Sequence, residues 1–260
     1  MVKFEFINTD LGYGSQKVLS NVNFSIDPGH ITCLLGANGV GKTTLFKTVL
    51  GIIPPLSGKI LLNGKPIEKY SQKEFAHCVA YVPQAHNTPF PYKVKDVVLF
   101  GRTVHLGMFS SPGKKDHLIV EKYLDMLEIS YLANKTFTEL SGGEKQMVIV
   151  ARALAQEAMF IILDEPTSNL DYGNQQRIIQ KIKSLKKQSI GILMATHAPD
   201  HAFMIGSQVI ILDKGILFRS GRPDRVITSE SLRQIYGIDV QIFDTPLNGS
   251  LSRKICAPVI

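Results

Sequence analysis

Cysteine is scarce in this 260-residue chain, and the three cysteines are poorly placed to cross-link it. Cys33, Cys78 and Cys256 are odd in number and far apart, and none belongs to a C-x-x-C pair. This pattern argues against a disulfide framework and against a zinc knuckle. We therefore expect reduced thiols, with Cys33 in the core of a strand.

Long apolar runs are also missing. The longest, MFIIL and SQVIIL, have the length of strands, whereas a membrane-spanning helix needs roughly 20 apolar residues. The first residues, MVKFEFINTDLGYG, lack the basic stretch and apolar core of a secretory signal. We expect a cytoplasmic chain that does not cross a membrane by itself.

The net charge of +7 is not concentrated in one basic segment. The densest run, KIKSLKK at 181–187, carries Ile182 and Leu185 at helical spacing, which is typical of the solvated face of a helix. We therefore expect no nucleic-acid partner. No internal repeat is visible, so each motif described below occurs once.

The order of apolar segments predicts an α/β core that is interrupted by a mostly helical insert. Strand-like and helix-like segments alternate over residues 1–84 and again over 159–260. Residues 85–158 are loop-rich at first and helical afterwards, and DHLIVEKYLDMLE places Ile119, Tyr123, Met126 and Leu127 on one face. HCVAYVPQ reads as a strand that ends at Pro83.

A glycine-rich loop between a predicted strand and a predicted helix has the composition of a phosphate site. Residues 36–43, GANGVGKT, fit the pattern G-x-x-x-x-G-K-[ST]. Gly36, Gly39 and Gly41 allow backbone N–H groups to surround phosphate oxygens, and the helix presents its positive end to them. Lys42 would reach the β- and γ-phosphates, and the Thr43 hydroxyl would bind Mg²⁺.

Two carboxylates follow the apolar strand in MFIILDEP. Asp164 would hold Mg²⁺ and Glu165 would orient and polarise the attacking water, although a D-E pair alone is more often a solvated turn. His197 ends another strand, where it could hydrogen-bond the γ-phosphate. A zinc site with His201 is disfavoured, because no glutamate lies between the two histidines and Pro199 opposes a helix through the pair.

The segment LSGGEKQ, residues 140–146, raises a separate question. Ser141 and Glu144 fit a capping box, S-x-x-E, which predicts a well-capped helix start. Capping does not require Gly142 and Gly143, and glycine is costly in ordered structure unless something approaches the backbone closely.

Read in order, GANGVGKTT, YVPQ, LSGGEKQ, IILDEP, SNLD and ATH make the chain resemble the nucleotide-binding subunits of ATP-binding cassette (ABC) transporters over nearly its whole length. The resemblance implies a P-loop NTPase fold with a RecA-like core, an N-terminal antiparallel β subdomain and a helical subdomain at 85–158. It implies ATP and Mg²⁺ as cofactors. The resemblance implies that Tyr13 stacks on adenine, that Glu165 is the catalytic glutamate, and that His197 is the switch histidine. It implies that Gln84 couples the γ-phosphate to the insert, acts in catalysis and is a further Mg²⁺ ligand, and that Asp171 lies at a subunit contact. The remaining implied site residues are Asp164 at Mg²⁺ and, at the phosphates, Gly36, Asn38, Gly39, Gly41, Lys42, Thr43 and Thr44.

The same resemblance answers the question about LSGGEKQ. Ser141, Gly142 and Gly143 are expected to contact the γ-phosphate of ATP that is held by a second copy of the chain. One chain has one loop of each kind, so two copies arranged head to tail would complete two sites. The expected output is movement of transmembrane permease subunits through FPYKVKDVVLFGR, residues 90–102, at the cytoplasmic face of the membrane.

Several stretches, among them VLFGRTVHLGMFSSPGKKD and LRQIYGIDVQIF, resemble importers of metal chelates and related solutes: ferric siderophores, haem, cobalamin and, in some members, molybdate. A solute-binding protein would then be an indirect partner. Ala198 and Pro199 depart from the Asp-Leu pair that often follows the switch histidine, which leaves the pose of His197 open. The alternative is a soluble ABC ATPase of iron-sulfur assembly or of nucleic-acid maintenance. The latter would need a coiled-coil arm or zinc insert, and neither is present in the sequence.

Overall fold

The computed structural model describes residues 3–84, 90–107, 109–246 and 252–259. Its contacts divide the chain into two compact units, residues 1–69 with 186–260, and residues 70–185. The helical subdomain expected at 85–158 is a part of the second unit, and its boundaries stay a prediction. No helix among these described residues is long and apolar enough to cross a bilayer.

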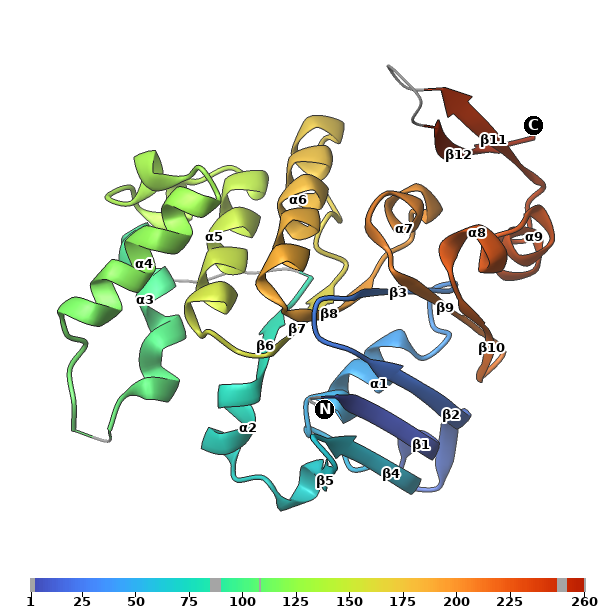
Figure 1. Cartoon of the computed structure of the whole chain (residues 1–260), viewed down its shortest axis with the longest axis horizontal. Helices are drawn as coiled ribbons and strands as arrows, with labels where there is room; N and C mark the ends of the chain where they lie inside the picture. Colours follow the sequence, from blue (N-terminus) through green and yellow to red (C-terminus); the bar gives the residue numbers. More distant parts are fainter. Residues whose placement is uncertain (1–2, 85–89, 108, 247–251, 260) are drawn as a thin grey trace. The chain divides into compact units, whose positions relative to one another are not determined.

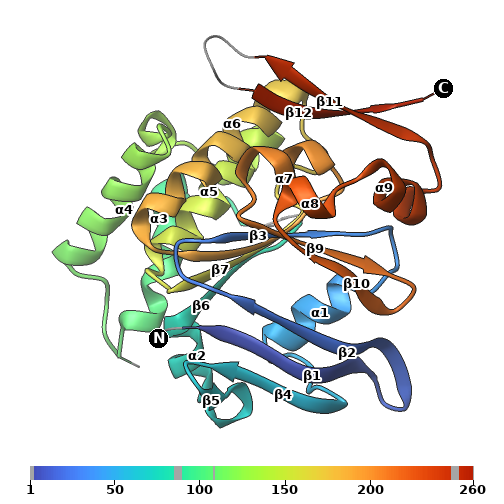
Figure 2. The same ribbon diagram turned by 45° about the vertical axis from the view of Figure 1, so that its right-hand side comes forward.

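The first unit contains a mixed sheet with strand order β5-β4-β1-β2-β10-β9-β3-β8. Strand β1 pairs antiparallel with β2 and β4, which confirms the N-terminal antiparallel subdomain, and β3 pairs parallel with β8 and β9. Strands β4, β1 and β2 are seen side by side in Figures 1 and 2. Their bounds are β1 Phe4–Tyr13, β2 Gln16–Ile26, β3 Ile31–Leu35, β4 Ser57–Leu62, β5 Lys65–Pro66, β8 Gly191–Ala195, β9 Gln208–Asp213 and β10 Ile216–Gly221.

The central parallel strands of this unit are buried along their whole length. All residues of β3 and β8 are buried, as expected for continuous apolar runs covered on both faces. Cys33 lies in β3 with no exposed surface, as predicted, and burial raises the pKa of its thiol to about 12. The helical elements are α1 Lys42–Val49, η1 Ile67–Lys69, α7 Pro199–Ile205, α8 Pro223–Val226 and α9 Ser229–Tyr236.

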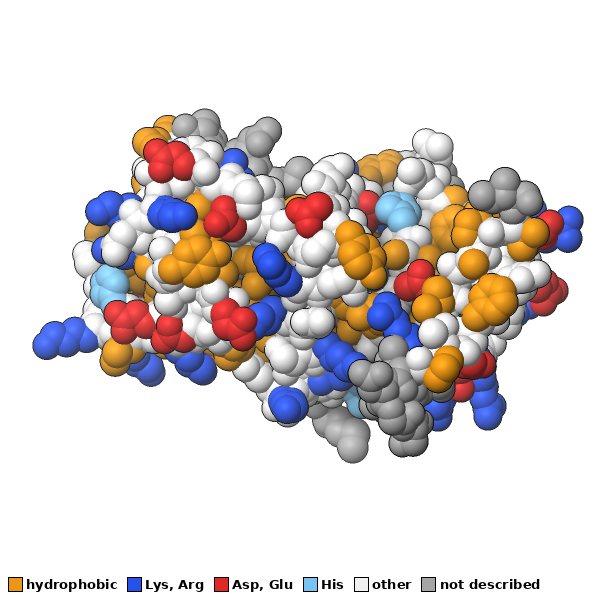
Figure 3. Space-filling view, turned by 90° about the horizontal axis from the view of Figure 1, so that it is seen from above, with side chains coloured by type: hydrophobic (Ala, Val, Ile, Leu, Met, Phe, Trp, Pro, Cys, Tyr) orange, Lys and Arg blue, Asp and Glu red, His pale blue; other side chains and the backbone are white. Residues whose placement is uncertain are grey.

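The chain ends in a two-stranded hairpin that the sequence did not predict. Strands β11 (Val240–Pro246) and β12 (Ser252–Pro258) pair antiparallel, with Phe243 opposite Ile255, and lie beyond α9 in Figure 1. Figure 3 shows apolar side chains at the surface toward its right-hand end, where Figure 1 draws these C-terminal elements. The exposed apolar residues here are Ile238, Phe243, Ile255 and Val259.

The second unit consists mainly of helices around one parallel strand pair, β6 and β7. In chain order its elements are α2 Gln72–Cys78, β6 Val79–Val82, α3 Val94–Leu99, η2 Phe100–His105, α4 Lys114–Met126, η3 Ser130–Leu132, η4 Phe137–Glu139, α5 Gly142–Ala155, β7 Phe160–Asp164 and α6 Tyr172–Ser184, with η5 Leu185–Gln188 at the unit boundary. Ile119, Tyr123 and Leu127, which were predicted to share one face with Met126, are buried, and Met126 is partly exposed. Ile182 and Leu185 are buried on α6 and η5, which supports the prediction that the KIKSLKK run is the solvated face of a helix.

A buried arginine connects the helices of this unit. The Arg102 guanidinium, on a residue that is 3% exposed, pairs with Asp116 at 3.0 Å and with Glu157 at 2.8 Å, and donates to the Ala155 carbonyl at 2.7 Å. These contacts join η2 to α4 and to the end of α5. Because a buried charge without partners is strongly destabilising, this network fixes the path of the chain after α3.

One predicted strand begins later than expected. The sequence predicts an extended chain from His77 through HCVAYVPQ, but β6 begins at Val79, because His77 and Cys78 end helix α2. That helix has a complete capping box, in which the Ser71 hydroxyl accepts from the Glu74 N–H and the Glu74 carboxylate accepts from the Ser71 N–H.

Candidate nucleotide site

The phosphate loop, residues 36–43, leaves the buried end of β3 and enters α1. The Lys42 ammonium donates hydrogen bonds to the carbonyl oxygens of Gly36 and Ala37, at 2.7 and 3.0 Å. Lys42 is only 6% exposed, so its charge lies within the loop. A positive charge and the N-terminal end of a helix therefore occur together, which favours an anionic ligand.

All three glycines of this loop, including Gly36 with φ 156°, have backbone conformations that side chains disfavour. Gly39 has φ 78° and Gly41 has φ 113°. A Cβ on Gly41 would also lie 2.9 Å from Leu19, whereas Gly39 has open space around it. Asn38 and Gly39 are exposed, so the backbone at the tip of the loop is accessible to a ligand.

Tyr13, at the end of β1, places its ring beside α1. The Lys47 ammonium lies 5.6 Å from the ring centroid, and a hydrogen bond with Thr44 lowers the pKa of the phenol, with a smaller contribution from Lys47. The residue is 44% exposed, so a part of its surface is open to a stacking partner. Thr43 is exposed as well, at the first turn of α1.

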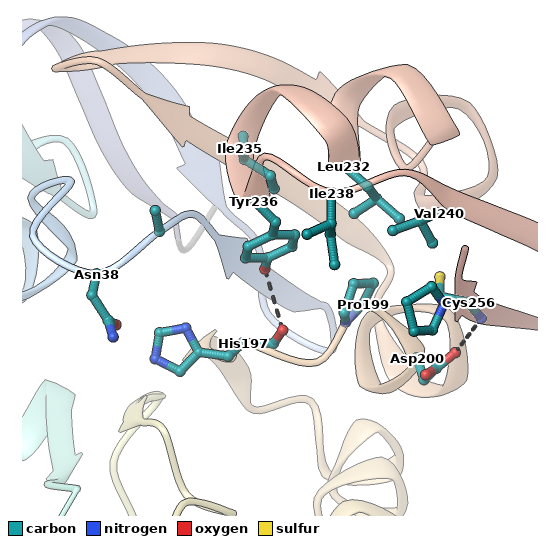
Figure 4. Close-up of a pocket in the computed structure, with 12 residues that line it drawn as sticks. Asn38, His197, Pro199, Asp200, Leu232, Ile235, Tyr236, Ile238, Val240 and Cys256 are labelled. Carbon is teal, nitrogen blue, oxygen red and sulfur yellow. Dashed lines mark hydrogen bonds between the residues drawn. The ribbon is translucent and has the colours of Figure 1, made fainter. Parts of the chain in front are cut away.

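His197 follows β8, the strand that pairs parallel with β3. The Thr196 N–H donates to the Leu34 carbonyl at 3.1 Å, so His197 lies at the same sheet edge as the phosphate loop. Asn38 and His197 line one end of a hollow of about 490 Å³ (Figure 4). His201, the alternative zinc partner, is buried, with its Nδ1 atom 3.3 Å from the Thr196 hydroxyl.

In the second unit, β6 and β7 run parallel with Val82 opposite Leu163, so the residues after both strands meet at one edge. The Gln84 amide donates to the Glu165 carboxylate at 2.9 Å. The Tyr81 hydroxyl donates to the Asp164 carboxylate at 3.3 Å. Burial, followed by the neighbouring Asp164, raises the pKa of Tyr81 to about 12, so its phenol keeps the proton that this hydrogen bond uses.

Glu165 has an unusual backbone for a residue with a side chain. Its φ of 49° lies in the left-handed region, which costs roughly 1–2 kcal/mol for a non-glycine residue. The Glu165 carbonyl accepts from the Ser168 N–H at 3.0 Å, which stabilises the turn. Strain of this kind is concentrated at functional sites, where the surrounding structure holds one side chain in a chosen direction.

The segment that contains Ser141 begins helix α5, as the capping box predicted. The Ser141 hydroxyl accepts from the Glu144 N–H at 3.3 Å, and the Glu144 carboxylate accepts from the Ser141 N–H at 2.9 Å. The latter hydrogen bond lowers the pKa of Glu144. A Cβ on Gly142 would meet Leu170 at 3.4 Å, an ordinary contact, so none of its neighbours in the described part of this chain requires glycine there.

Gly143 and Asp171 are linked through a residue that the motifs did not include. Asp171 is the N-cap of α6 and accepts from the backbone and side-chain N–H groups of Asn174, at 2.9 and 2.5 Å. The backbone hydrogen bond is the main reason that the pKa of Asp171 is lowered. The Asn174 amide occupies the space that a Cβ on Gly143 would need, at 2.5 Å. The segments SNLD and LSGGEKQ are therefore in contact within one chain.

The structure thus places the predicted residues in three groups, one in the first unit and two in the second. Tyr13, the phosphate loop and His197 lie in the first unit. The second unit holds Gln84, Asp164 and Glu165 in one group, and Ser141, Gly142, Gly143 and Asp171 along the linked segments. Tyr81 and Asn174 were missed, although both stand within three residues of a predicted site residue, and the parallel register of two apolar strands could have suggested Tyr81.

Known proteins share this architecture. A family model described as ABC transporter matches residues 19–168. The molybdate import ATP-binding protein MolC of Haemophilus influenzae is 36% identical over 220 residues, which cover 84% of this chain and 81% of the relative. The iron(3+)-hydroxamate import ATP-binding protein FhuC of Bacillus subtilis is 36% identical over 237 residues, 91% of this chain and 88% of the relative.

A solved structure is similar over the whole length. It is described as a metal-chelate type ABC transporter in an inward-facing conformation, and the two chains share 31% identity with a TM-score of 0.88. The match covers 100% of this chain and 98% of the other. The fold expected from the sequence is therefore confirmed.

Proposed function

Because this chain belongs to the ABC transporter family and is one of its ATP-hydrolysing, nucleotide-binding subunits, we propose that it powers the import of a metal chelate or related metal-containing solute. The observation that carries the proposal is the full-length similarity to a metal-chelate type transporter. Relatives named for molybdate and for iron(3+)-hydroxamate are equally identical to the chain, so the solute is proposed as a class.

In the proposed site, residues of the first unit bind the nucleotide. Tyr13 stacks on adenine through its open ring. Backbone N–H groups at Gly36, Asn38, Gly39 and Gly41 donate to the phosphates, together with the N-terminal end of α1 and with Thr44. Lys42 exchanges its carbonyl partners in the loop for the β- and γ-phosphate oxygens, and His197 donates to the γ-phosphate.

Mg²⁺ is proposed as the metal that accompanies ATP. Thr43 supplies a hydroxyl oxygen, Asp164 a carboxylate and Gln84 an amide oxygen, since its Nε2 atom is the donor to Glu165. Oxygen ligands of this kind, completed by phosphate oxygens and water, suit Mg²⁺. When bound, the ion would neutralise charge that develops on the phosphates.

The proposed hydrolysis uses Glu165 as the base. Its carboxylate accepts a proton from the attacking water as the new oxygen–phosphorus bond forms, and the bond from the γ-phosphorus to the bridging oxygen breaks, releasing ADP and phosphate. The turn with positive φ and the hydrogen bond from Gln84 hold this carboxylate in place. The Tyr81 hydroxyl orients Asp164 in the same group.

A second copy of the chain is proposed to complete each site. Ser141, Gly142 and Gly143 would contact the γ-phosphate that the other copy holds, and Asp171 would lie at the contact between copies. The surroundings of Gly142 support this arrangement. None of its described neighbours in the same chain would clash with a Cβ added there, so glycine is not required by contacts within one copy. A two-fold arrangement gives two equivalent sites, each made of one phosphate loop and one LSGGEKQ segment.

Transmembrane permease subunits are proposed as partners, which would place the chain at the cytoplasmic face of the membrane as a peripheral subunit. An aromatic cluster of Phe90, Tyr92 and Phe100 supports a docking surface there. These side chains are 59%, 41% and 43% exposed, and neighbouring ring centroids are 5.9 and 5.2 Å apart. Exposed, contiguous aromatic rings are typical of a surface that a partner covers. The expected segment, residues 90–102, lies within the described part of the chain.

The proposal is tested by purifying the tagged chain from its native membrane and identifying the proteins that accompany it. We expect a polytopic permease, and we expect Phe100→Ser to lose it while the ATPase activity of the isolated chain stays unchanged. The matched control is Phe109→Ser, because Phe109 is 97% exposed and lies outside the aromatic cluster. Recovery of iron-sulfur assembly proteins, or equal behaviour of both variants, would contradict the proposal.

A further inference from the structure

The peptide group that joins His197 to Ala198 is held from both sides. Its carbonyl, on His197, accepts a hydrogen bond from the Tyr236 hydroxyl at 3.2 Å. Its N–H, on Ala198, donates to the Thr196 hydroxyl at 3.2 Å. Because the peptide group is planar, holding it restrains ψ of His197 and φ of Ala198, and so helps to set the direction in which the His197 side chain leaves the chain.

The two residues after His197 cannot provide such support with polar groups of their own side chains. The side chains of Ala198 and Pro199 are both apolar, and Pro199 also lacks a backbone N–H. Ala198 adopts φ −97° and ψ 108°, the extended conformation that a following proline favours. The restraint on the His197 carbonyl comes instead from Tyr236, 39 residues later in the sequence.

Helix α9, which carries Tyr236, is itself firmly anchored. Its start is a capping box between Thr228 and Ser231, and Leu232 and Ile235 are buried. On the outer side, the Gln234 amide donates to the Asp213 carboxylate at 2.8 Å. The helix is therefore a rigid platform from which one hydroxyl can reach the His197 loop.

The space between this helix and the loop is not filled by side chains of the described residues. The hollow of about 490 Å³ separates α9 from His197, Pro199 and Asp200, and Figure 4 shows the Tyr236 hydroxyl reaching the His197 carbonyl at one end of it. At the other end, the Cys256 N–H donates to the Asp200 carboxylate at 2.9 Å. On the side that faces α9, the His197 loop is therefore held by hydrogen bonds at the two ends of the hollow rather than by close packing across it.

We infer that Tyr236 is a positioning residue for the switch histidine: its hydroxyl holds the His197 carbonyl so that the imidazole is presented toward the phosphate loop. The inference rests on the proposed role of His197 in hydrolysis. Tyr236 also supplies a side-chain hydrogen bond to the His197 carbonyl, which Ala198 and Pro199 cannot provide. Loss of the hydroxyl would leave the ring present but less often in its productive direction.

The test compares Tyr236→Phe with Gln234→Leu in steady-state ATP hydrolysis. Both variants remove one side-chain hydrogen bond from α9, but only the first releases the His197 loop. We expect Tyr236→Phe to lower kcat about 2- to 10-fold, the scale of one net hydrogen bond, with KM for ATP within about 2-fold of wild type. Gln234→Leu should leave kcat unchanged. An unchanged kcat in Tyr236→Phe, or an equal loss in both variants, overturns the inference.

A double-mutant cycle separates positioning from a general structural effect. In a His197→Ala background, Tyr236→Phe should cause no further loss of kcat, because the ring that it positions is gone. A further loss of the same size in that background shows a merely structural role and refutes the inference. Normal turnover of His197→Ala alone refutes the proposed role of His197, which is a different result from failure of Tyr236→Phe.

Discussion

At the scale of single residues, the positions after β8 combine a proposed catalytic group with a buried histidine. His201 is 4% exposed on α7, with its Nδ1 atom facing the Thr196 hydroxyl. Burial lowers its pKa, Arg253 lowers it further, and Asp200 opposes the shift. The neutral imidazole is therefore the form that fits the folded chain, and it supports the threonine that accepts from Ala198.

This histidine predicts how stability depends on pH. In the unfolded chain His201 takes up a proton near its ordinary pKa of about 6.5, whereas the folded chain resists protonation until a lower pH. The unfolded state therefore binds more protons as the pH falls below about 6.5, and the free energy of unfolding decreases there by at most about 1.4 kcal/mol per pH unit. Thermal unfolding between about pH 7.5 and about pH 5.5 brackets this range and measures the slope.

The comparison variant is His201→Asn, which keeps an acceptor near the position of Nδ1 but does not titrate. Its melting temperature should fall less than that of the wild type over the same range. Burial also lowers the pKa of His77, but that contribution is present in both proteins and cancels in the difference. Equal slopes for the two proteins would show that His201 does not resist protonation.

Motifs can indicate individual residues where the chemistry is local in sequence, but not where it depends on the fold. Lys42 and Thr43 follow from one short pattern, because a phosphate loop is a continuous segment. Tyr236 could not be found this way, since its contact with His197 spans 39 residues and requires the position of α9. The segment around Tyr236, LRQIYG, contains no short motif that indicates a catalytic or binding role.

At the scale of elements, the start of α5 combines a helix cap with a proposed phosphate contact. Ser141 and Glu144 cap the helix, as expected from S-x-x-E. Gly143 is explained within the chain by the Asn174 amide, whereas Gly142 is not explained by its described neighbours. The need for glycine therefore has a different physical origin at each of the two positions, and the sequence alone could not distinguish them.

Gly142→Ala gives a prediction in which stability and activity change in opposite directions. Alanine should raise the free energy of unfolding by about 0.4–1 kcal/mol, because the site is helical and its Cβ would make an ordinary contact. ATP hydrolysis should fall on the order of 10- to 100-fold, because a methyl group would displace the γ-phosphate that the second copy is proposed to present. Chemical denaturation and steady-state turnover measure the two effects.

The control for this variant is Gly113→Ala. Gly113 is the N-cap of α4 and has a negative φ, and a methyl group added there would meet no described atom within 4 Å. It should change stability slightly and leave turnover at the wild-type level. Full activity of Gly142→Ala would show that no phosphate approaches Gly142.

Elements were predictable to the extent that their signals lay in one segment. The strand before the phosphate loop and helix α1 follow from periodicity and glycine, as found. Helix α2 was missed because none of its residues is buried, so no apolar period marks it, although the S-x-x-E at 71–74 signals its start. The C-terminal hairpin depends on pairing between β11 and β12 across intervening chain, which no local pattern specifies.

At the scale of the whole molecule, the central claim is that a competent site needs two copies of the chain. Each copy has one phosphate loop and one LSGGEKQ segment. A Lys42→Ala copy keeps an intact LSGGEKQ segment, and a Ser141→Arg copy keeps an intact phosphate loop. Each variant alone should be inactive, because every site in its homodimer contains the altered element.

Mixing the two variants is the most direct test. In an equal mixture about half of the dimers are mixed, and each mixed dimer has one unaltered site of two, so ATP hydrolysis should recover to about a quarter of the wild-type rate per chain. Recovery should depend on total protein concentration. A mixture that stays as inactive as the separate variants, at concentrations where the wild type turns over, would contradict a site shared between two copies.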